Sequence, residues 1–365
     1  MSKVAIIRTK PETILQDIQK VMQLGDIANS LDKSATTILK NNISWHLMYP
    51  SANTTPWQLE GTILGLKNAG FNEMVCVENE TVVTNASKGE IFNKQKVVCD
   101  YYHVPIKYNF KSCDMKWQKY KPKAKMDVLD EIFPEGIFLP DYFHGKNIVH
   151  LPTTKCHIYT NITGSMKNAF GGLLNNRRHY CHRQIHKTLV DLLAIQKEIH
   201  KGIFTVTDGT TAGNGPGPRT MIPIAKDILL ASSDCVAIDA VAAKIMGFDP
   251  MEHLFIRSAH ERGLGIGRID EIEIVGNVDI EQDNWNFKTG DNAASSVGKL
   301  FWFGPMRWLQ RLMFHTPIVY GFILASAIYH DKIWYPSKGR KVVDSWLENN
   351  PWGRLFKDYQ PGKLK

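Results

Sequence analysis

Two glycine-containing runs carry residue types that bind anions. The first, residues 162–172, places Gly164, Ser165, Lys167 and Asn168 within five positions. Small residues let a backbone close around a ligand, and free N–H groups at the start of a helix favour a negative charge. Lys167 would add a full positive charge, although the spacing is not that of a P-loop. The run predicts an anion site, with a tight turn bearing a solvated lysine as the alternative.

The second run, residues 207–219, has Asp208 before its glycines and Arg219 after them. Asp208 follows an apolar stretch that predicts a strand, and open α/β sheets place ligand groups at the carboxyl ends of strands. It could act as a general base or a metal ligand, or it could only begin an Asx turn. At Gly213, Asn214 and Gly215 the backbone of this run could approach a ligand closely. The alternative is that these three residues only form a turn.

A basic, histidine-rich segment follows the first run. His179, His182 and His186 are spaced three and then four residues apart, so a continuous helix would place them on one face. Such a face could bind a divalent metal or, through His182, transfer a proton. The neighbouring Arg and Lys residues would repel a cation and instead favour phosphate or carboxylate, unless the face is only solvated. Arg177 and Arg178 are the predicted anion ligands.

Four further positions extend the predicted site. Lys40 and Asn42 lie at the edge of a predicted strand, where a lysine and an amide indicate either a ligand or an exposed strand end. Lys155 follows another predicted strand at the same sheet edge. Asp239 lies one turn inside an otherwise apolar helix and could face the site. The predicted catalytic residues are then Asp208, His182 and Lys167. The predicted substrate-binding residues are Lys40, Asn42, Lys155, Gly164, Ser165, Asn168, Arg177, Arg178, Gly213, Asn214, Gly215 and Asp239.

The elements that position these residues alternate between strands and helices. Apolar runs predict strands over residues 4–8, 37–44, 74–78, 147–151, 203–207, 228–231 and 271–275. Helical patterns occupy residues 12–29, 56–70, 183–200, 235–246 and 250–262. This rhythm favours an α/β domain over residues 1–279, with a largely parallel sheet flanked by helices. We expect two lobes, divided near residue 145, with the site in the cleft.

The composition changes after residue 279. Residues 280–298 are polar and predict a linker before a distinct segment, 299–365. The last 65 residues hold ten Lys or Arg against four Asp or Glu, and five of the nine tryptophans. Basic and aromatic residues gather at anionic membrane surfaces, so the segment predicts a membrane-surface appendage. Its uncharged stretch, 312–330, could be an interfacial anchor, a hairpin on the core or a span, although His315 and Pro317 interrupt it.

The bulk composition indicates a folded cytoplasmic protein. Of 365 residues, 43% are hydrophobic and 22% are charged. The N-terminus lacks the apolar run of a signal peptide, and the six cysteines form no Cys-x-x-Cys pair. We expect reduced thiols and a cytoplasmic location, which includes the inner membrane face. No nucleic-acid module is recognised, and the sequence does not indicate an oligomeric state.

Taken in order, these motifs resemble the domain-of-unknown-function 362 family of bacteria and archaea. The matching segments are Ile38–Asn42, Thr54–Pro56, Thr163–Gly171, Asp208–Gly209, Gly213–Pro216, Asp234–Ala243 and Met246–Pro250. The resemblance implies no single reaction. Many members resemble fusions to ferredoxin-type cluster domains, whose place the basic, aromatic segment takes here. A more distant similarity to nickel-dependent lactate-racemase-like proteins would make lysines and histidines around a cofactor relevant.

The leading hypothesis is an enzyme that acts near the membrane on an anionic substrate. The substrate would be a phosphorylated or carboxylated small molecule, or a lipid-linked intermediate. One alternative is a metal- or iron–sulfur-associated accessory protein, which the cluster domains of the family favour. Another is a non-catalytic membrane scaffold, in which both glycine runs would be turns only.

Overall fold

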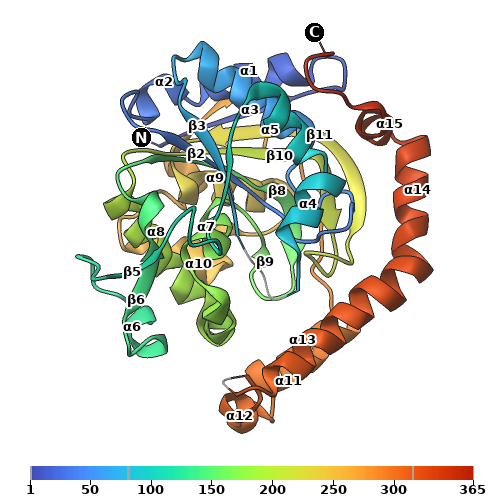
Figure 1. The fold of residues 1–365 in the computed structure, drawn as a ribbon. Coiled ribbons are helices and arrows are strands. Elements are labelled where there is room, and N and C mark those ends of the chain that lie inside the picture. Colours follow the sequence, from blue (N-terminus) through green and yellow to red (C-terminus); the bar gives the residue numbers. More distant parts are fainter. Residues whose placement is uncertain (1, 80–82, 315, 365) are drawn as a thin grey trace.

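The computed structural model of the protein describes residues 2–79, 83–314 and 316–364 (Figure 1). Its centre is a large twisted sheet with the strand order β12-β1-β11-β10-β7-β2-β3-β4. These strands are β1 Ser2–Arg8, β2 Thr37–Asn41, β3 Met74–Glu78, β4 Ile106–Tyr108, β7 Asn147–Leu151, β10 Ile203–Asn214, β11 Ile222–Ser232 and β12 Ile272–Gly276. Neighbours along this path are parallel except where β11 pairs with β1 and β10. The predicted, largely parallel α/β sheet is confirmed.

Shorter strands branch from this sheet or lie beside it. β8, Thr153–His157, pairs with β10 and with β9, Asn161–Ile162. β5, Trp117–Tyr120, and β6, Ile137–Pro140, form a separate antiparallel pair. β2 pairs in parallel with β7, so strands from both sides of residue 145 belong to one sheet.

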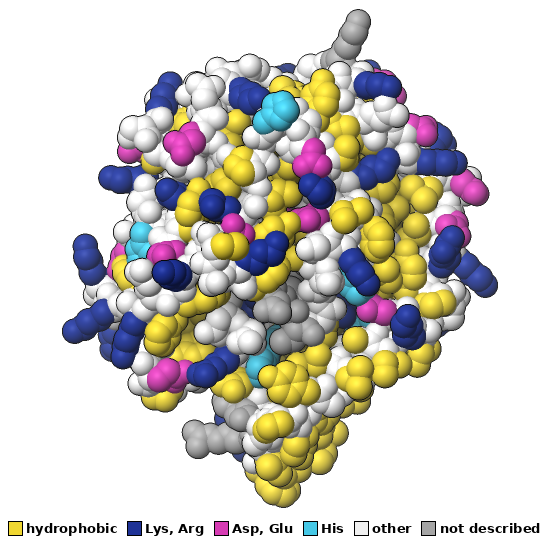
Figure 2. Space-filling model, viewed as in Figure 1, with side chains coloured by type: hydrophobic (Ala, Val, Ile, Leu, Met, Phe, Trp, Pro, Cys, Tyr) yellow, Lys and Arg dark blue, Asp and Glu magenta, His cyan; other side chains and the backbone are white. Residues whose placement is uncertain are grey.

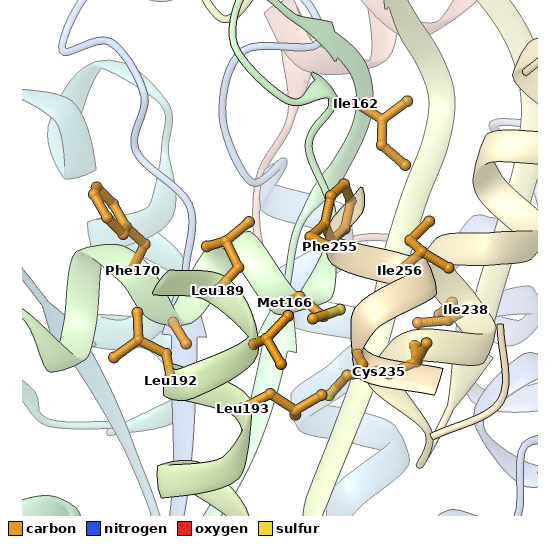
Figure 3. Packing of buried hydrophobic residues seen from close by; sticks show 14 of the residues in the cluster. Ile162, Met166, Phe170, Leu189, Leu192, Leu193, Cys235, Ile238, Phe255 and Ile256 are labelled. Carbon is orange, nitrogen blue, oxygen red and sulfur yellow. The ribbon is translucent and has the colours of Figure 1, made fainter. Parts of the chain in front are cut away.

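Helices cover both faces of the sheet because side chains alternate along each strand. In β1, Ala5 and Ile7 join the core beneath one set of helices, whereas Val4 and Ile6 join the core beneath the other. The first face carries α1 Ile14–Leu24, α2 Ile27–Ser30, α3 Pro56–Asn68 and α5 Gln95–Tyr102, and α4 Ala86–Phe92 packs beside α5. The second carries α7 Ser165–Leu173, α8 Ile185–Ile199, α9 Cys235–Met246 and α10 Leu254–Glu261. Figure 3 shows how side chains of α7, α8, α9 and α10 meet in this second core.

Local signals account for several helix ends. Thr55 accepts a hydrogen bond from the Gln58 amide at the start of α3, where Pro56 fits the first turn. Asp234 caps α9 by accepting from the amides of Val236 and Ala237, and Gly247 ends the helix with φ of +98°. Short helical turns complete the body: α6 Leu129–Ile132, and 3₁₀ turns at Asp141–Phe143, Asn176–Gln184, Pro250–Glu252 and Ile269–Glu271.

The second glycine run differs from its prediction. β10 does not end at residue 207 but continues to Asn214, paired with β11 through a register shift between Gly209 and Thr211. The unpredicted length of β11 supplies the hydrogen-bond partner that keeps these small residues extended. Most of the predicted ligand loop is therefore strand, and only residues 215–219 turn.

The C-terminal residues form a helical arm outside the body (Figure 1). The arm, residues 293–358, contains α11 Ala293–Trp302, a 3₁₀ turn Arg307–Leu309, α12 Gln310–Phe314, α13 Val319–Ala327, a π-helical stretch Ile328–Gly339, α14 Arg340–Asn349 and α15 Pro351–Asp358. The helical backbone continues through Ile328 and Arg340, so α13 to α14 form one rod. Among the described helices, none has the length and apolarity that crossing a membrane requires. His315, within the predicted uncharged stretch, lies outside the described residues.

Aromatic contacts and hydrogen bonds hold the arm against the body. Trp352 of α15 lies 5.6 Å from Trp57 of α3, measured between ring centroids, and its Nε1 donates to Asp227. Within the π-helical stretch, Asp331 accepts from the Nε1 of Trp45 at 2.7 Å. Part of the predicted linker, residues 280–298, also packs on the body. The side chains of Trp285 and Phe287 join the core, and the amide of Trp285 donates to the carbonyl of Ile245 in α9.

Candidate functional site

A cavity of about 220 Å³ lies where β2 and β3 end and α7 begins. Four cationic side chains line it: Lys40, Lys167, Arg178 and Arg219. No Asp or Glu is among its described lining residues. The carboxyl ends of strands in an open α/β sheet are where ligands bind, and an excess of positive charge in a small cavity favours an anion. We call this space the cationic cavity.

Lys40 is buried at the end of β2, and its Nζ donates to the Asn41 carbonyl at 2.6 Å. Burial lowers the pKa of Lys40 to about 8, although the nearby Glu78 carboxylate opposes this shift. Burial also raises the pKa of Glu78 to about 7. Two residues on, Asn42 lines the cavity and accepts from the Ser44 hydroxyl at 2.8 Å. The predicted edge position of Lys40 and Asn42 is therefore a cavity wall, not an exposed strand end.

The first glycine run supplies the opposite wall. Lys167 in α7 lines the cavity, and burial lowers its pKa to about 8, with repulsion from Arg178 adding to the effect. The Nδ2 of Asn168 donates to the carbonyl of Lys40 at 2.8 Å, which ties α7 to β2. Both lysines thus keep their charge less readily than a solvated lysine does. A bound anion would restore the charged form.

The N-terminus of α7 is already occupied by a carboxylate. Asp239, on α9, accepts from the amides of Ser165 at 2.6 Å and Met166 at 3.0 Å. A Cβ on Gly164 would lie 2.2 Å from the Oδ1 of Asp239, so glycine is required for this close approach. Burial raises the pKa of Asp239 to about 7, and the two amide hydrogen bonds oppose the shift. The anion expected at this helix terminus is therefore the protein's own Asp239.

Asp208 and Lys155 are not among the described lining residues of the cationic cavity. Asp208 is buried inside β10 and accepts from Thr55 Oγ1 at 2.5 Å, Trp57 Nε1 at 3.0 Å and the Thr210 amide at 2.7 Å. Burial raises the pKa of Asp208, although these hydrogen bonds oppose the rise. Buried Lys155 donates to Thr153 Oγ1 at 2.5 Å, and burial lowers its pKa strongly. Their hydrogen bonds fit structural roles.

The second glycine run reaches the cavity through its last two residues, Pro218 and Arg219. Gly213 lies in β10, where a Cβ would be 2.5 Å from the Sδ of Met221. Asn214 accepts from the amide of Lys288, and Gly215 begins the turn with φ of +101°. Beyond this turn, Arg219 enters the cationic cavity, and its Nε donates to the Ser44 carbonyl at 3.4 Å. Burial lowers the pKa of Arg219 to about 10.

Arg219 is a cation of the cavity that was not among the predicted ligands. A cation directly after a Gly-Pro turn was the available signal. Arg177, by contrast, is a predicted anion ligand that does not line the cavity. It is exposed, and its Nη1 pairs with Glu135 at 2.7 Å. Arg178, one position along, lines the cavity, and its Nη1 donates to the Gly171 carbonyl at 3.2 Å.

The three predicted metal ligands do not share one helix face. Residues 176–184 form a 3₁₀ helix, which has about three residues per turn, and α8 begins only afterwards. His179 contacts the Phe314 carbonyl at 3.1 Å, whereas His186 stacks on Phe255 with ring centroids 5.9 Å apart. Within the described ranges, no group of three or more His, Cys, Asp or Glu side chains is arranged to hold a metal ion.

His182 lies at the rim of the cationic cavity. Its Nδ1 donates to the His179 carbonyl at 2.9 Å, and its ring centroid lies 5.5 Å from that of Tyr159. Burial lowers the pKa of His182 to about 4, so the imidazole is neutral at physiological pH. Because Nδ1 carries the proton, Nε2 is an acceptor. The ring also borders two further cavities.

Comparisons with known proteins agree with the motif content of the chain. Over 106 residues it is 29% identical to the thylakoid-associated protein sll1697 of Synechocystis sp., which covers 28% of this chain. The aligned part spans 33% of that relative's length. A family described as a domain of unknown function, DUF362, matches residues 37–244, from β2 into α9 and including every cation of the cavity. Since this match covers more than half of the chain, the protein belongs to the DUF362 family.

Proposed function

We propose that the protein binds the phosphate or carboxylate group of a small molecule in the cationic cavity. The observation that supports the proposal is the convergence of Lys40, Lys167, Arg178 and Arg219 without a described carboxylate in the lining. An anion would form charge-assisted hydrogen bonds with groups that are otherwise costly to bury. Lys40 and Lys167, with pKa values of about 8, could also exchange a proton with the ligand near neutral pH.

The test is calorimetric titration of the full chain with inorganic phosphate. Lys167→Met should reduce the affinity at least tenfold, because it removes one charge and keeps a side chain of similar length. Lys187→Met is the matched control, since Lys187 is exposed on α8 and does not line the cavity. Circular dichroism would establish that both variants are folded. No phosphate binding by the unmodified protein, or equal binding by Lys167→Met, would overturn the proposal.

We also propose that the arm places this cavity at an anionic membrane surface. Large apolar side chains are exposed along it, including Trp308 at 77%, Tyr320 at 67% and Leu324 at 61%. Figure 2 shows such side chains gathered at the lower end of the molecule, where α11 to α13 lie. An exposed apolar patch beside basic residues such as Lys299 is typical of proteins that bind membrane surfaces. The thylakoid association of the Synechocystis relative is in keeping with this location.

Flotation with vesicles containing anionic lipid tests the arm. Replacing both Trp308 and Leu324 by Glu should move the protein from the vesicle fraction to the soluble fraction. Ile222→Glu is the control, because Ile222 is 65% exposed but lies on β11 in the body. Equal flotation of the double variant and the control would contradict a membrane role for the arm.

A further inference from the structure

Three cavities meet at His182. The cationic cavity shares His182, Pro218 and Arg219 with a second cavity of about 250 Å³. It shares His182 and Val83 with a third cavity of about 370 Å³. The second and third also share lining residues, which include Tyr159 and Ser326. The shared residues place the three cavities side by side around His182, and their combined size is in the range of small-molecule sites.

The third cavity differs in chemistry from the first. Its described lining contains no Lys, Arg, Asp or Glu, and apolar side chains dominate it. Most of the wall comes from the arm, with Trp302 of α11, Phe314 of α12 and Phe322 of α13 among the lining residues. The remaining side belongs to the body and consists of Val83, Tyr159, His179 and His182. We call this space the apolar cavity.

The same helix that lines the apolar cavity also carries part of the exposed apolar surface. In α13, Phe322 and Ile323 line the cavity, whereas Tyr320 and Leu324 are exposed. No residue of α13 is charged, so both of its faces suit an apolar environment. The hydrocarbon chain of a lipid that leaves a bilayer would therefore meet apolar side chains on both sides of α13.

From this arrangement we infer that the ligand is an amphiphile, with a phosphate or carboxylate head in the cationic cavity and a hydrocarbon chain in the apolar cavity. This inference rests on the proposed anion binding and adds the substrate class. His182, whose imidazole is neutral, lines both spaces and stands between the charged and the apolar side chains. A wholly polar metabolite would leave the apolar cavity unfilled, whereas an anionic lipid or lipid-linked intermediate would use both spaces.

The experiment compares anionic head groups with and without a hydrocarbon chain. The full-length protein is titrated with inorganic phosphate, then with ethyl, butyl, hexyl and octyl phosphate below their micelle-forming concentrations. The affinity should rise about three- to fourfold for each methylene that enters the apolar cavity. A parallel series from acetate to octanoate decides between phosphate and carboxylate heads. Equal affinities from ethyl to octyl in both series would overturn the amphiphile inference.

Variants separate this inference from the proposed function. Ala325→Trp fills the apolar cavity from its edge and should remove the chain-length gain while leaving inorganic phosphate binding unchanged. Leu324→Trp is the matched control, because the adjacent Leu324 is exposed and does not line the cavity. If inorganic phosphate binds but octyl phosphate binds no better, the amphiphile inference fails and anion binding stands. If neither binds, the proposed function itself fails. A chain-length gain that survives Ala325→Trp would place the chain elsewhere and overturn the assignment.

Discussion

Anion binding should weaken steeply between pH 7 and pH 9. Lys40 and Lys167 have pKa values of about 8 in the ligand-free protein, because burial disfavours their charged forms. Each lysine is mostly protonated at pH 7 and mostly neutral at pH 9. If the ligand requires both charges, each lysine lowers the affinity about tenfold over this range, so the pair lowers it about 100-fold. The affinity for an anion must fall as the pH rises, because deprotonation of the lysines removes positive charge from the site.

Sulfate is the appropriate probe because it remains a dianion throughout this range, whereas phosphate itself titrates near neutral pH. Calorimetric dissociation constants at half-unit steps from pH 6 to pH 10 would give the profile. Lys167→Arg keeps the charge between pH 7 and pH 9, so about half of the logarithmic decrease over this range should disappear. A dissociation constant that is the same at pH 7 and pH 9 would refute the reasoning, as would an unchanged profile in Lys167→Arg.

Three further predictions use neighbouring or buried residues. Arg178→Ala should weaken sulfate binding at least tenfold and Arg177→Ala should not, because only Arg178 lines the cationic cavity; calorimetry of both variants checks this, and equal losses would contradict the assignment. Asp239→Ala should cost about 2 to 3 kcal/mol in urea unfolding, because the buried amides of Ser165 and Met166 lose their acceptor; an unchanged midpoint would argue against the cap. Asp208→Ala should destabilise the fold by about 2 kcal/mol, since Trp57 and Thr55 lose their shared acceptor. Its sulfate affinity should stay within about twofold, and a loss of affinity in a folded variant would instead place Asp208 in the site.

The sequence by itself determined the alternation of strands and helices, because apolar periodicity and helix caps act over a few residues. The cap at Asp234 and the strand that holds Lys40 are examples. It also indicated that Lys40, Lys167 and Arg178 meet, because parallel strands bring their carboxyl ends to one edge of the sheet. These inferences need only the local pattern of residues and the right-handed crossover between parallel strands.

The tertiary structure decided which of the predicted groups face the cavity. Asp239 reaches the amide of Ser165 across 74 positions and fills the helix terminus that appeared open to a ligand. Pairing with β11 keeps β10 extended through Asp208, and the turn that follows brings Arg219 inward. The apolar cavity exists only because the arm folds back against Tyr159 and His182. Such contacts depend on partners far apart in the chain, so no local pattern of residues encodes them.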